Sequence, residues 1–491
     1  STQDQVWIQR WDGSSEEWGR GVAVDSKDNI YFVGDTSSFG AGGYDAFIGK
    51  YASNGTQLWN QTWGGSDEER CFCVAVDNDD NLYAAGFTMS FGAGNYDAFL
   101  VKYASNGTQL WNRTWGYSSL DKGYGIVVDS NNNVYLVGET NKSASNLYDL
   151  FIVKYDSSGK QLWNSTWGGA NTDSGRDVAI DSDNNLYITG HTKSFGTGEY
   201  AALIVSFTSD GVYLWNLTWN YYNSSTSYDL SYGIALDSQK NIYITGLTAP
   251  SAGEFGDAFL VKFSMKIQII LDNPNNLSVI QKPAFINLTV CGKDLDIVMW
   301  RANVTQTTWT TSFVGTYDID LSSFSPGQTV HFWVYANDTR GNWNEIVILL
   351  TFYQSYIPGV SPYVQDWNRT WGDSRPDVGA DIAIDSNDYV YICGYTDHYP
   401  VTYDDTFLRK VDSAGNLVWY EVWAGSYPDG GQGVAIDGND YIYVGGWLEE
   451  SGFGPSYRKA HLLKYNSTQD QVWIQRWDGS SEEWGRGVAV D

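Results

Sequence analysis

The chain has 491 residues, of which 16% are aromatic and only 18% charged, and its formal net charge is −29. This acidic balance argues against binding of nucleic acid or anionic lipid headgroups, since both need clustered lysine and arginine. Four cysteines are too few for a disulfide framework. Because no signal peptide or long apolar run is present, we interpret the sequence as a mature or excised segment.

A short pattern recurs along the chain, usually every 52 residues. An apolar run ends in Asp, a polar turn follows, and a second alternating run contains Tyr and ends in Gly, as in residues 177–190 (DVAIDSDNNLYITG). A fixed period of about 50 in a chain rich in Trp, Tyr, Val and Gly predicts repetition of a β-sheet unit. The copies begin at Gly21, Cys73, Gly125, Asp177, Gly233, Asp381, Gly433 and Gly487.

The first full copy predicts four short strands, at residues 21–25, 29–35, 45–51 and 57–64. Because every link between them is short, they must form an antiparallel meander. The first strand uses Gly, Val and Ala, whereas the fourth carries Trp59 and Trp63 on one face. Small residues inside and large residues outside fit a radial array of sheets, in which the Trp pair fills the widening gap between blades. Sugar stacking is the alternative role for these Trp rings.

The cysteines are expected to be small core residues. Cys71 and Cys73 flank Phe72 within a strand, so they should point to the same face, where a bridge would be strained. Cys393 occupies the strand position that Val33 has in the first copy.

The fifth copy is interrupted. Its third strand ends at Phe263, and a Trp-bearing fourth strand appears only about 100 residues later. We therefore expect three segments. They are residues 1–264 (first part of the propeller), residues 265–362 (an insert between the third and fourth strands of blade five) and residues 363–491 (second part of the propeller).

The insert has the sequence pattern of a β-sandwich. Alternating runs such as VHFWVYAND (residues 330–338) are separated by turn signals. Residues 336–342 (ANDTRGN) resemble the A-x-D-x-x-G-N turn of immunoglobulin-like modules in prokaryotic surface proteins. Cys291 is alone in the insert, so this sandwich would lack a disulfide.

Seven first strands precede the point at which the chain repeats itself. The copies resemble the seven-bladed β-propeller repeat family SBBP in three runs, G-V-A-V/I-D-S-x-x-N-x-Y-x-x-G, D-A-F-L-V-K-Y and x-G-x-Q-L-W-N-x-T-W-G-G. The resemblance covers about four-fifths of the chain. It implies an all-β, seven-bladed propeller of four-stranded antiparallel blades, a surface or secreted location in bacteria or archaea, and no defined catalysis.

Residues 1–25 recur without a single change at residues 467–491. The other copies diverge freely, so ordinary repetition does not explain this identity. Three explanations are open: tandem near-identical units, a sequence wrapped by one period, or a recent duplication that supplies a swapped strand. We favour a covalent or strand-linked series of units.

Seven blades need seven outermost strands, and the chain offers eight. The seventh place can be filled by residues 5–13 or by residues 471–479. An unpaired Trp-rich strand is an adhesive edge, so we expect the surplus copy to join propellers into a filament. The residues assigned to this inter-subunit strand are Val6, Trp7, Ile8, Trp11, Val472, Trp473, Ile474 and Trp477.

Asn-X-Ser/Thr sequons are abundant and indicate an extracellular protein with N-linked glycans, with an archaeal source favoured. The alternative is that Asn and Thr are simply common in turns and strands. The sequons are at Asn54, Asn60, Asn106, Asn112, Asn141, Asn164, Asn216, Asn223, Asn276, Asn287, Asn303, Asn337, Asn368 and Asn466.

Some turns after the first strands read D-x-D-x-N, like the start of a calcium loop. The Gly and Glu that such a loop requires later are missing, and Asx residues form hairpin turns unaided. Calcium is the only cofactor that the sequence suggests, and its candidate ligands are Asp77, Asp79, Asn81, Asp181, Asp183 and Asn185.

Catalytic signatures are missing from the sequence. The four His residues lie in unrelated repeat positions, and no nucleophile elbow, Cys–His pair or phosphate loop is present. We therefore predict a non-enzymatic structural subunit of an extracellular, glycosylated cell-surface filament or sheath, whose partners are copies of itself. The alternative is a secreted carbohydrate-binding or adhesion module, whose partners are surface glycans.

Overall fold

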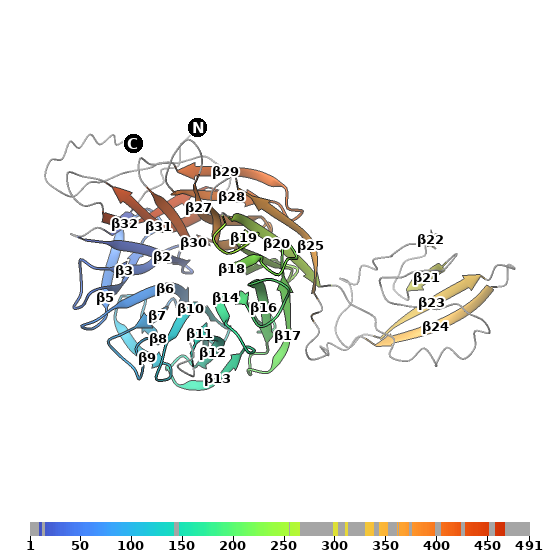
Figure 1. The fold of residues 1–491 in the computed structure, drawn as a ribbon, viewed down its shortest axis with the longest axis horizontal. Coiled ribbons are helices and arrows are strands. Elements are labelled where there is room, and N and C mark those ends of the chain that lie inside the picture. The colour runs from blue at the N-terminus through green and yellow to red at the C-terminus, as the bar shows by residue number, and fades with distance from the viewer. Residues whose placement is uncertain are drawn as a thin grey trace. The chain divides into compact units, whose positions relative to one another are not determined.

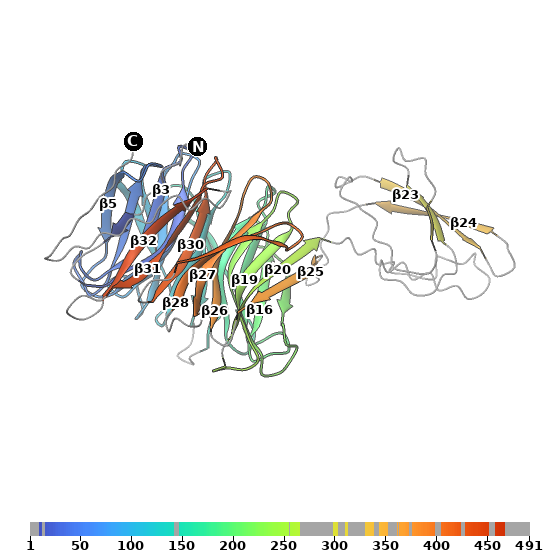
Figure 2. The same ribbon diagram turned by 90° about the horizontal axis from the view of Figure 1, so that it is seen from above.

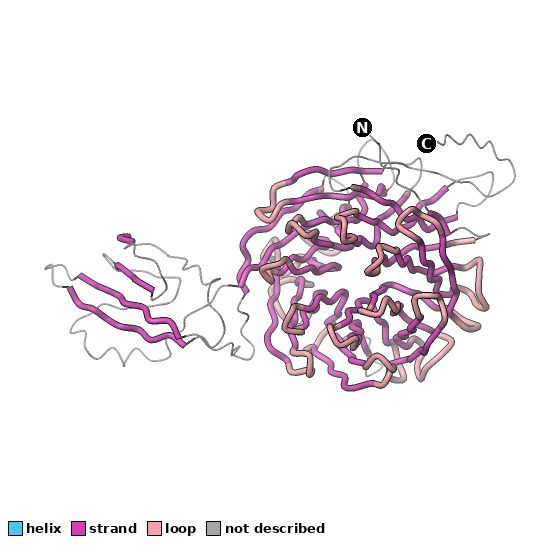
Figure 3. Tube along the Cα trace, turned by 180° about the vertical axis from the view of Figure 1, so that it is seen from behind, coloured by secondary structure: helices cyan, strands magenta, loops and turns pink. Residues whose placement is uncertain are grey.

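A computed structural model describes residues 9–11, 15–141, 147–254, 256–265, 298–302, 310–312, 329–337, 343–351, 361, 363–372, 376–397, 404–423, 428–450 and 457–466. The chain divides into two compact units, Ser1–Ser264 with Gln365–Asp491, and Met265–Val364. The described residues form strands and loops without a helix (Figure 3). None of them therefore lies in a helix long and apolar enough to cross a membrane.

The first unit is a ring of seven four-stranded antiparallel sheets (Figure 1). In blade one, β2 (Glu17–Val24), β3 (Ile30–Thr36), β4 (Asp45–Tyr51) and β5 (Gln57–Trp63) pair in chain order. The first strand of each blade is innermost and the fourth lies at the rim. The predicted seven-bladed propeller is therefore confirmed.

The next three blades repeat this order. Blade two contains β6 (Glu69–Val76), β7 (Leu82–Thr88), β8 (Asp97–Tyr103) and β9 (Gln109–Trp115). Blade three contains β10 (Asp121–Val128), β11 (Val134–Thr140), β12 (Asp149–Tyr155) and β13 (Gln161–Trp167). Blade four contains β14 (Asp173–Ile180), β15 (Leu186–Thr192), β16 (Ala201–Phe207) and β17 (Tyr213–Trp219).

Of the last three blades, blades five and seven each include one strand from a distant part of the chain, and blade six keeps the simple order. Blade five contains β18 (Tyr228–Leu236), β19 (Ile242–Ala249), β20 (Asp257–Met265) and the distant β25 (Tyr363–Trp371). Blade six contains β26 (Asp377–Ile384), β27 (Val390–Asp397), β28 (Asp404–Val411) and β29 (Leu417–Trp423). Blade seven contains β30 (Asp429–Ile436), β31 (Ile442–Glu450), β32 (Tyr457–Tyr465) and, at its edge, β1 (Gln9–Trp11).

The N-terminal copy of the duplicated strand closes the ring. β1 pairs antiparallel with β32, with Gln9, Arg10 and Trp11 opposite Leu462, His461 and Ala460. Figure 2 views the ring from above and shows β30, β31 and β32 side by side. Of the two copies that compete for this place, the N-terminal copy therefore supplies the strand, through residues Gln9–Trp11. The second copy, with Val472, Trp473, Ile474 and Trp477, lies outside the described residues, as do Val6, Trp7 and Ile8.

Each first strand is longer than predicted and contains a β-bulge. In blade one the register shifts between Gly19 and Gly21, so the strand begins at Glu17 and not at Gly21. In blade two the shift lies between Cys71 and Cys73, whose partners are the adjacent residues Gly86 and Ala85. Because adjacent strand residues point to opposite faces, the prediction that the two thiols share a face is wrong.

The paired Trp residues of the fourth strands pack between blades, as predicted. Trp63 is 8% exposed and stacks on Phe99 of the next blade, with ring centroids 4.4 Å apart. The Trp59 indole donates to the backbone carbonyl of Ser105, also in the next blade, at 3.0 Å. The large rings thus fill the gap at the rim and hold neighbouring sheets together.

The turn that receives Trp59 depends on a glycine, and this gives a testable prediction. Gly107 has φ +86°, and a Cβ there would lie 3.0 Å from the Trp59 ring. Gly253 has the same φ but open space around it. We expect Gly253→Ala to lower the free energy of unfolding by about 1 kcal/mol through backbone strain, and Gly107→Ala to cost about 1–3 kcal/mol more through overpacking. If the two substitutions lower the free energy of unfolding equally in denaturant titrations, the packing of Trp59 on this turn does not contribute to stability.

The second unit contains one antiparallel sheet among its described residues. Its order is β22-β21-β23-β24, made of β22 (Thr310–Ser312), β21 (Val298–Ala302), β23 (Thr329–Asn337) and β24 (Trp343–Thr351). β23 coincides with the predicted alternating run at residues 330–338. A second sheet is not among the described residues, so the immunoglobulin-like sandwich stays a prediction.

Candidate functional site

The turn after each first strand is organised by its Asp. In blade two, Asp77 is 5% exposed, and its Oδ1 accepts from the backbone N–H groups of Asp79 at 3.0 Å and Asn81 at 2.8 Å. Its Oδ2 accepts from the Asn81 amide at 3.1 Å and the Tyr83 hydroxyl at 3.3 Å. The Lys102 ammonium, from the third strand, lies 3.0 Å from the same oxygen. Asp77 is therefore a buried carboxylate with a full set of partners.

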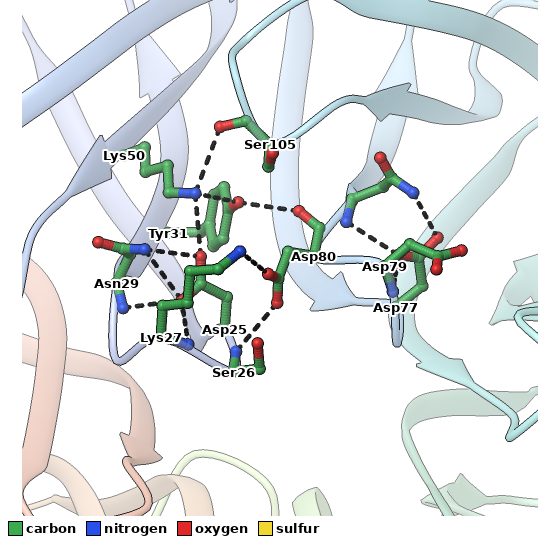
Figure 4. A network of polar contacts seen from close by, with 11 residues as sticks. Asp25, Ser26, Lys27, Asn29, Tyr31, Lys50, Asp77, Asp79, Asp80 and Ser105 are labelled. Atoms are coloured by element: carbon green, nitrogen blue, oxygen red, sulfur yellow. Dashed lines mark hydrogen bonds and ion pairs between the residues drawn. The ribbon is translucent and has the colours of Figure 1, made fainter.

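Blade one has the same arrangement (Figure 4). The Lys50 ammonium lies 2.9 Å from Asp25 and also donates to the Tyr31 hydroxyl at 2.7 Å. Burial alone would raise the pKa of Asp25, but hydrogen bonds from Asn29 and Lys50 hold it below its ordinary value. The corresponding carboxylates of the other blades are Asp129, Asp181, Asp237, Asp385 and Asp437.

These turns also join neighbouring blades. Asp80, at φ 59°, accepts from the Ser26 backbone N–H at 3.1 Å and pairs with Lys27 at 2.5 Å, both in the preceding turn (Figure 4). The Asn439 amide of blade seven donates to Asp28 of blade one at 2.8 Å. The turns therefore link blades along one face of the ring, including the junction between the last and the first blade.

The structure gives the predicted calcium ligands other partners. In blade four, Asp181 repeats the turn of Asp77, and Lys240 of blade five reaches both Asp181, at 3.5 Å, and Asp183. Within the described ranges, no group of three His, Cys, Asp or Glu side chains is arranged to hold a metal ion. Calcium binding by Asp77, Asp79, Asn81, Asp181, Asp183 and Asn185 stays a prediction, and at Asp77 an ion would have to displace Lys102.

Sequence reasoning missed the lysines that pair with these carboxylates. A lysine occupies the next-to-last position of the D-A-F-L-V-K-Y run in six of the seven blades, and a charge inside an apolar strand requires a buried partner. That recurrence was the available signal. The lysines are Lys50, Lys102, Lys154, Lys262, Lys410 and Lys464, and blade four has Ser206 at this position.

The glycan acceptors differ in exposure. Asn141 is 1% exposed, and a glycan there is incompatible with this burial. Asn216, Asn368 and Asn466 are half-buried, and the exposed acceptors are Asn54, Asn60, Asn106, Asn112, Asn164 and Asn223. Asn276, Asn287 and Asn303 lie outside the described residues, and the side chain of Asn337 is not described.

The β-bulges place one unpaired residue of each blade on the innermost strands. We call these seven residues the collar. All are half-buried, and unlike the flanking positions they differ strongly from blade to blade. They are Arg20, Phe72, Tyr124, Arg176, Tyr232, Ala380 and Gln432.

Aromatic rings and guanidinium groups of the collar contact one another across blades. The Arg20 guanidinium lies 5.1 Å from the Phe72 ring centroid, and the Phe72 and Tyr124 rings are 5.3 Å apart. The Arg176 guanidinium lies 4.1 Å from the Tyr124 ring. These contacts form a continuous row over blades one to four, with spacings typical of cation–π and aromatic pairs.

Two carboxyl groups, Asp177 and Asp381, directly follow the collar residues Arg176 and Ala380 in the chain and carry a testable pH dependence. Asp177 accepts from the Ile234 backbone N–H at 3.0 Å, and Asp381 accepts from the Val434 N–H at 2.8 Å. Burial raises the pKa of Asp177 to about 6 and of Asp381 to about 8, the latter also through repulsion from Asp177.

Because both pKa values are raised, the folded ring binds more protons than the unfolded chain above pH 4. This contribution to stability is complete below pH 4 and is lost as pH rises through about 6 to about 8. Each group can contribute a slope of at most about 1.4 kcal/mol per pH unit. We expect Asp381→Asn to flatten the fall in unfolding free energy between pH 6 and pH 8, measured by urea titration. The exposed-loop control Asp67→Asn should keep the wild-type slope, and equal slopes in both variants would contradict the assignment.

Comparison with known proteins agrees with this ring. Residues 108–143, 167–196 and 371–400 match the family model described as beta-propeller repeat, SBBP. The chain contains SBBP beta-propeller repeats. These segments fall in blades two to six, so the match to the family model lies within the propeller.

The proteins that resemble this chain in sequence are longer, and the matched regions are small parts of them. Regulatory protein FlaEY of Caulobacter vibrioides is 29% identical over 139 residues, which are 24% of this chain and 15% of FlaEY. The uncharacterized WD repeat-containing protein L264 of Acanthamoeba polyphaga mimivirus is 25% identical over 216 residues, 32% of this chain and 16% of L264. The chain thus spans about a sixth of the length of these relatives. Sqt1 from Chaetomium thermophilum has 10% identity and a TM-score of 0.43, covering 94% of this chain and 99% of Sqt1.

Proposed function

We propose that this protein is a structural subunit of an extracellular, glycosylated filament or sheath. The second copy of the duplicated sequence, within residues 467–491, would close the seventh blade of a neighbouring ring, as β1 (Gln9–Trp11) does in this one. The pairing of β1 with β32 is the observation that carries the proposal. It fills the edge of blade seven with one copy of a sequence that the chain contains twice.

The physical reason is competition for one edge. A propeller without its last fourth strand exposes the N–H and C=O groups of β32 and leaves a gap at the rim. Either copy has the residues to fill that edge, but one ring accepts only one. Strand addition to an open edge gives stable association through main-chain hydrogen bonds, and a head-to-tail contact that does not close gives a filament.

The other features of this proposal rest on sequence and exposure. Six exposed sequons on turns and rim strands support N-linked glycans and an extracellular site. The four-stranded sheet of the second unit supports an immunoglobulin-like module. An archaeal or bacterial surface is the source that these features favour, and calcium at Asp77 or Asp181 would be an auxiliary ligand.

Carbohydrate binding is the alternative function. The aromatic and arginine side chains of the collar favour it, because rings and guanidinium groups are suited to sugar faces and acidic groups. The closing strand provides no support for carbohydrate binding, so the two proposals rest on different parts of the ring.

The filament is tested by removing the second copy. We expect the full chain to assemble with rising concentration and to show fibres by negative-stain electron microscopy, whereas residues 1–466 stay single rings in light scattering. A full-length control with Trp473→Ala and Trp477→Ala should also stay single. If the protein of residues 1–491 remains monomeric at high concentration, the filament proposal is wrong.

A further inference from the structure

We propose that the collar binds a sugar that carries a carboxylate, such as a uronic acid. The site lies on the innermost strands and does not involve the closing strand, so it stands or falls separately from the filament. The first observation that supports this site is the pattern of repetition. Positions that hold the blades together recur, as the Asp–Lys pairs do, whereas the collar positions differ in almost every blade. Residues that the fold does not require to be alike are free to form a single site.

Positive charge gathers on one half of the ring. Arg20 and Arg176 belong to the collar, and Arg70 and Lys122 lie two residues before it on the first strands of blades two and three. The same positions of blades five to seven carry no charge: Leu230, Tyr232, Val378, Ala380, Gly430 and Gln432. In a chain with a net charge of −29, this cluster is a local exception.

Carboxylates pair with the three arginines of this cluster and leave part of each arginine side chain exposed. Asp35, fully buried, pairs with Arg20 at 3.1 Å and with Arg70 at 3.0 Å, and Arg70 also pairs with Glu68 at 2.5 Å. Glu139 lies 3.5 Å from Arg176 and accepts from the Tyr124 hydroxyl at 2.8 Å. The side chains of the three arginines remain 18–24% exposed.

Arg176 has spare donors for a ligand. Its Nε is buried without a hydrogen-bond partner among the described residues, its ion pair with Glu139 is long at 3.5 Å, and the Tyr124 hydroxyl lies beside the guanidinium. A guanidinium binds a carboxylate through two parallel N–H groups, a geometry that an ammonium cannot provide. An incoming carboxylate at Arg176 would therefore gain paired hydrogen bonds where the protein itself supplies few.

The rings beside the arginines provide the second half of the recognition. Phe72 and Tyr124 lie between Arg20 and Arg176, and Tyr232 follows in blade five. Flat, half-buried aromatic faces suit the C–H face of a sugar ring, and the neighbouring cations suit its acidic group. A neutral sugar would lack the charge contact, and a simple carboxylate would lack the stacking contact.

The test compares three probes by isothermal titration calorimetry: trigalacturonate, its methyl ester and acetate. We expect trigalacturonate to bind, the ester to bind at least tenfold more weakly, and acetate at the same concentration to give no signal. Equal binding of the ester would overturn the carboxylate role, equal binding of acetate would reduce the site to a general anion site, and no binding of trigalacturonate would overturn the proposal.

Variants then locate the site. Arg176→Gln should weaken trigalacturonate at least tenfold, and Arg176→Lys should recover only part of the affinity because it restores charge without the paired donors. Arg113→Gln is the matched control, since Arg113 also stacks on an aromatic ring, Trp111, but lies on the rim strand β9. If Arg176→Gln does not fold, Lys122→Gln tests the same half of the collar. Unchanged affinity in the folded variants would contradict the proposed location.

Discussion

Replacing Lys102 by serine is expected to lower the free energy of unfolding by about 3–5 kcal/mol, the usual cost of removing one partner of a buried ion pair. The side chain of Lys102 is 5% exposed and that of Asp77 is fully buried, with 3.0 Å between their charged atoms. The substitution leaves the buried carboxylate of Asp77 with neutral hydrogen-bond donors only. Denaturant titration followed by tryptophan fluorescence measures the loss.

Blade four shows how the same defect can be compensated. There Ser206 replaces the lysine, and Lys240, in the turn of the next blade, reaches Asp181 instead. In blade three the residue equivalent to Lys240 is Asn132, which has nearly the same φ, 60° against 63°. Lys102→Ser with Asn132→Lys should therefore recover at least about 1 kcal/mol relative to the sum of the single changes. Strict additivity would show that the turn lysine does not substitute for the strand lysine.

A chain that lacks both terminal copies, residues 15–466, is expected to lose at least about 3 kcal/mol of stability. In blade one the equivalent strand contributes Trp63, which is 8% exposed and stacked on the next blade. Removing the N-terminal copy deletes Trp7 and Trp11, the sequence equivalents of Trp59 and Trp63, and opens the edge of β32.

Adding the missing strand as a peptide provides the control. A peptide of residues 1–14 should bind the shortened chain and raise its melting temperature toward that of residues 1–466. The same peptide with Trp7→Ala and Trp11→Ala should have little effect. A shortened chain as stable as residues 1–466 would mean that the ring does not need a fourth strand in blade seven.

The strands and their order were largely predictable from the sequence, because hydrophobic alternation and turn residues recur at a fixed spacing. The third strand of blade one was predicted to the residue, Asp45–Tyr51, and the rim Trp residues pack as expected. The choice between the two closing strands was left open, since identical sequences carry no information about which one pairs.

The collar and the buried ion pairs were not predictable in the same way. A bulge inserts one residue, so reading a strand with a period of two assigns Phe72 and Cys73 to the wrong faces. Lys102 and Asp77 belong to different strands, and nothing in either run alone reveals their contact. The candidate calcium residues were located correctly in turns, but Asp77 and Asp181 accept from their own turns and pair with lysine, and Asp79 accepts from the Asn132 amide of the next blade.

The identity of the strand on β32 is most directly measured by disulfide trapping. Arg10 and His461 face each other across β1 and β32, and Arg476 is the equivalent of Arg10 in the second copy. We predict that Arg10→Cys with His461→Cys forms a bond within one chain, and that His461→Cys with Arg476→Cys forms bonds only between chains, seen as a ladder on non-reducing gels. A bond between positions 461 and 476 within a single chain would mean that the second copy closes its own ring, and would contradict the filament.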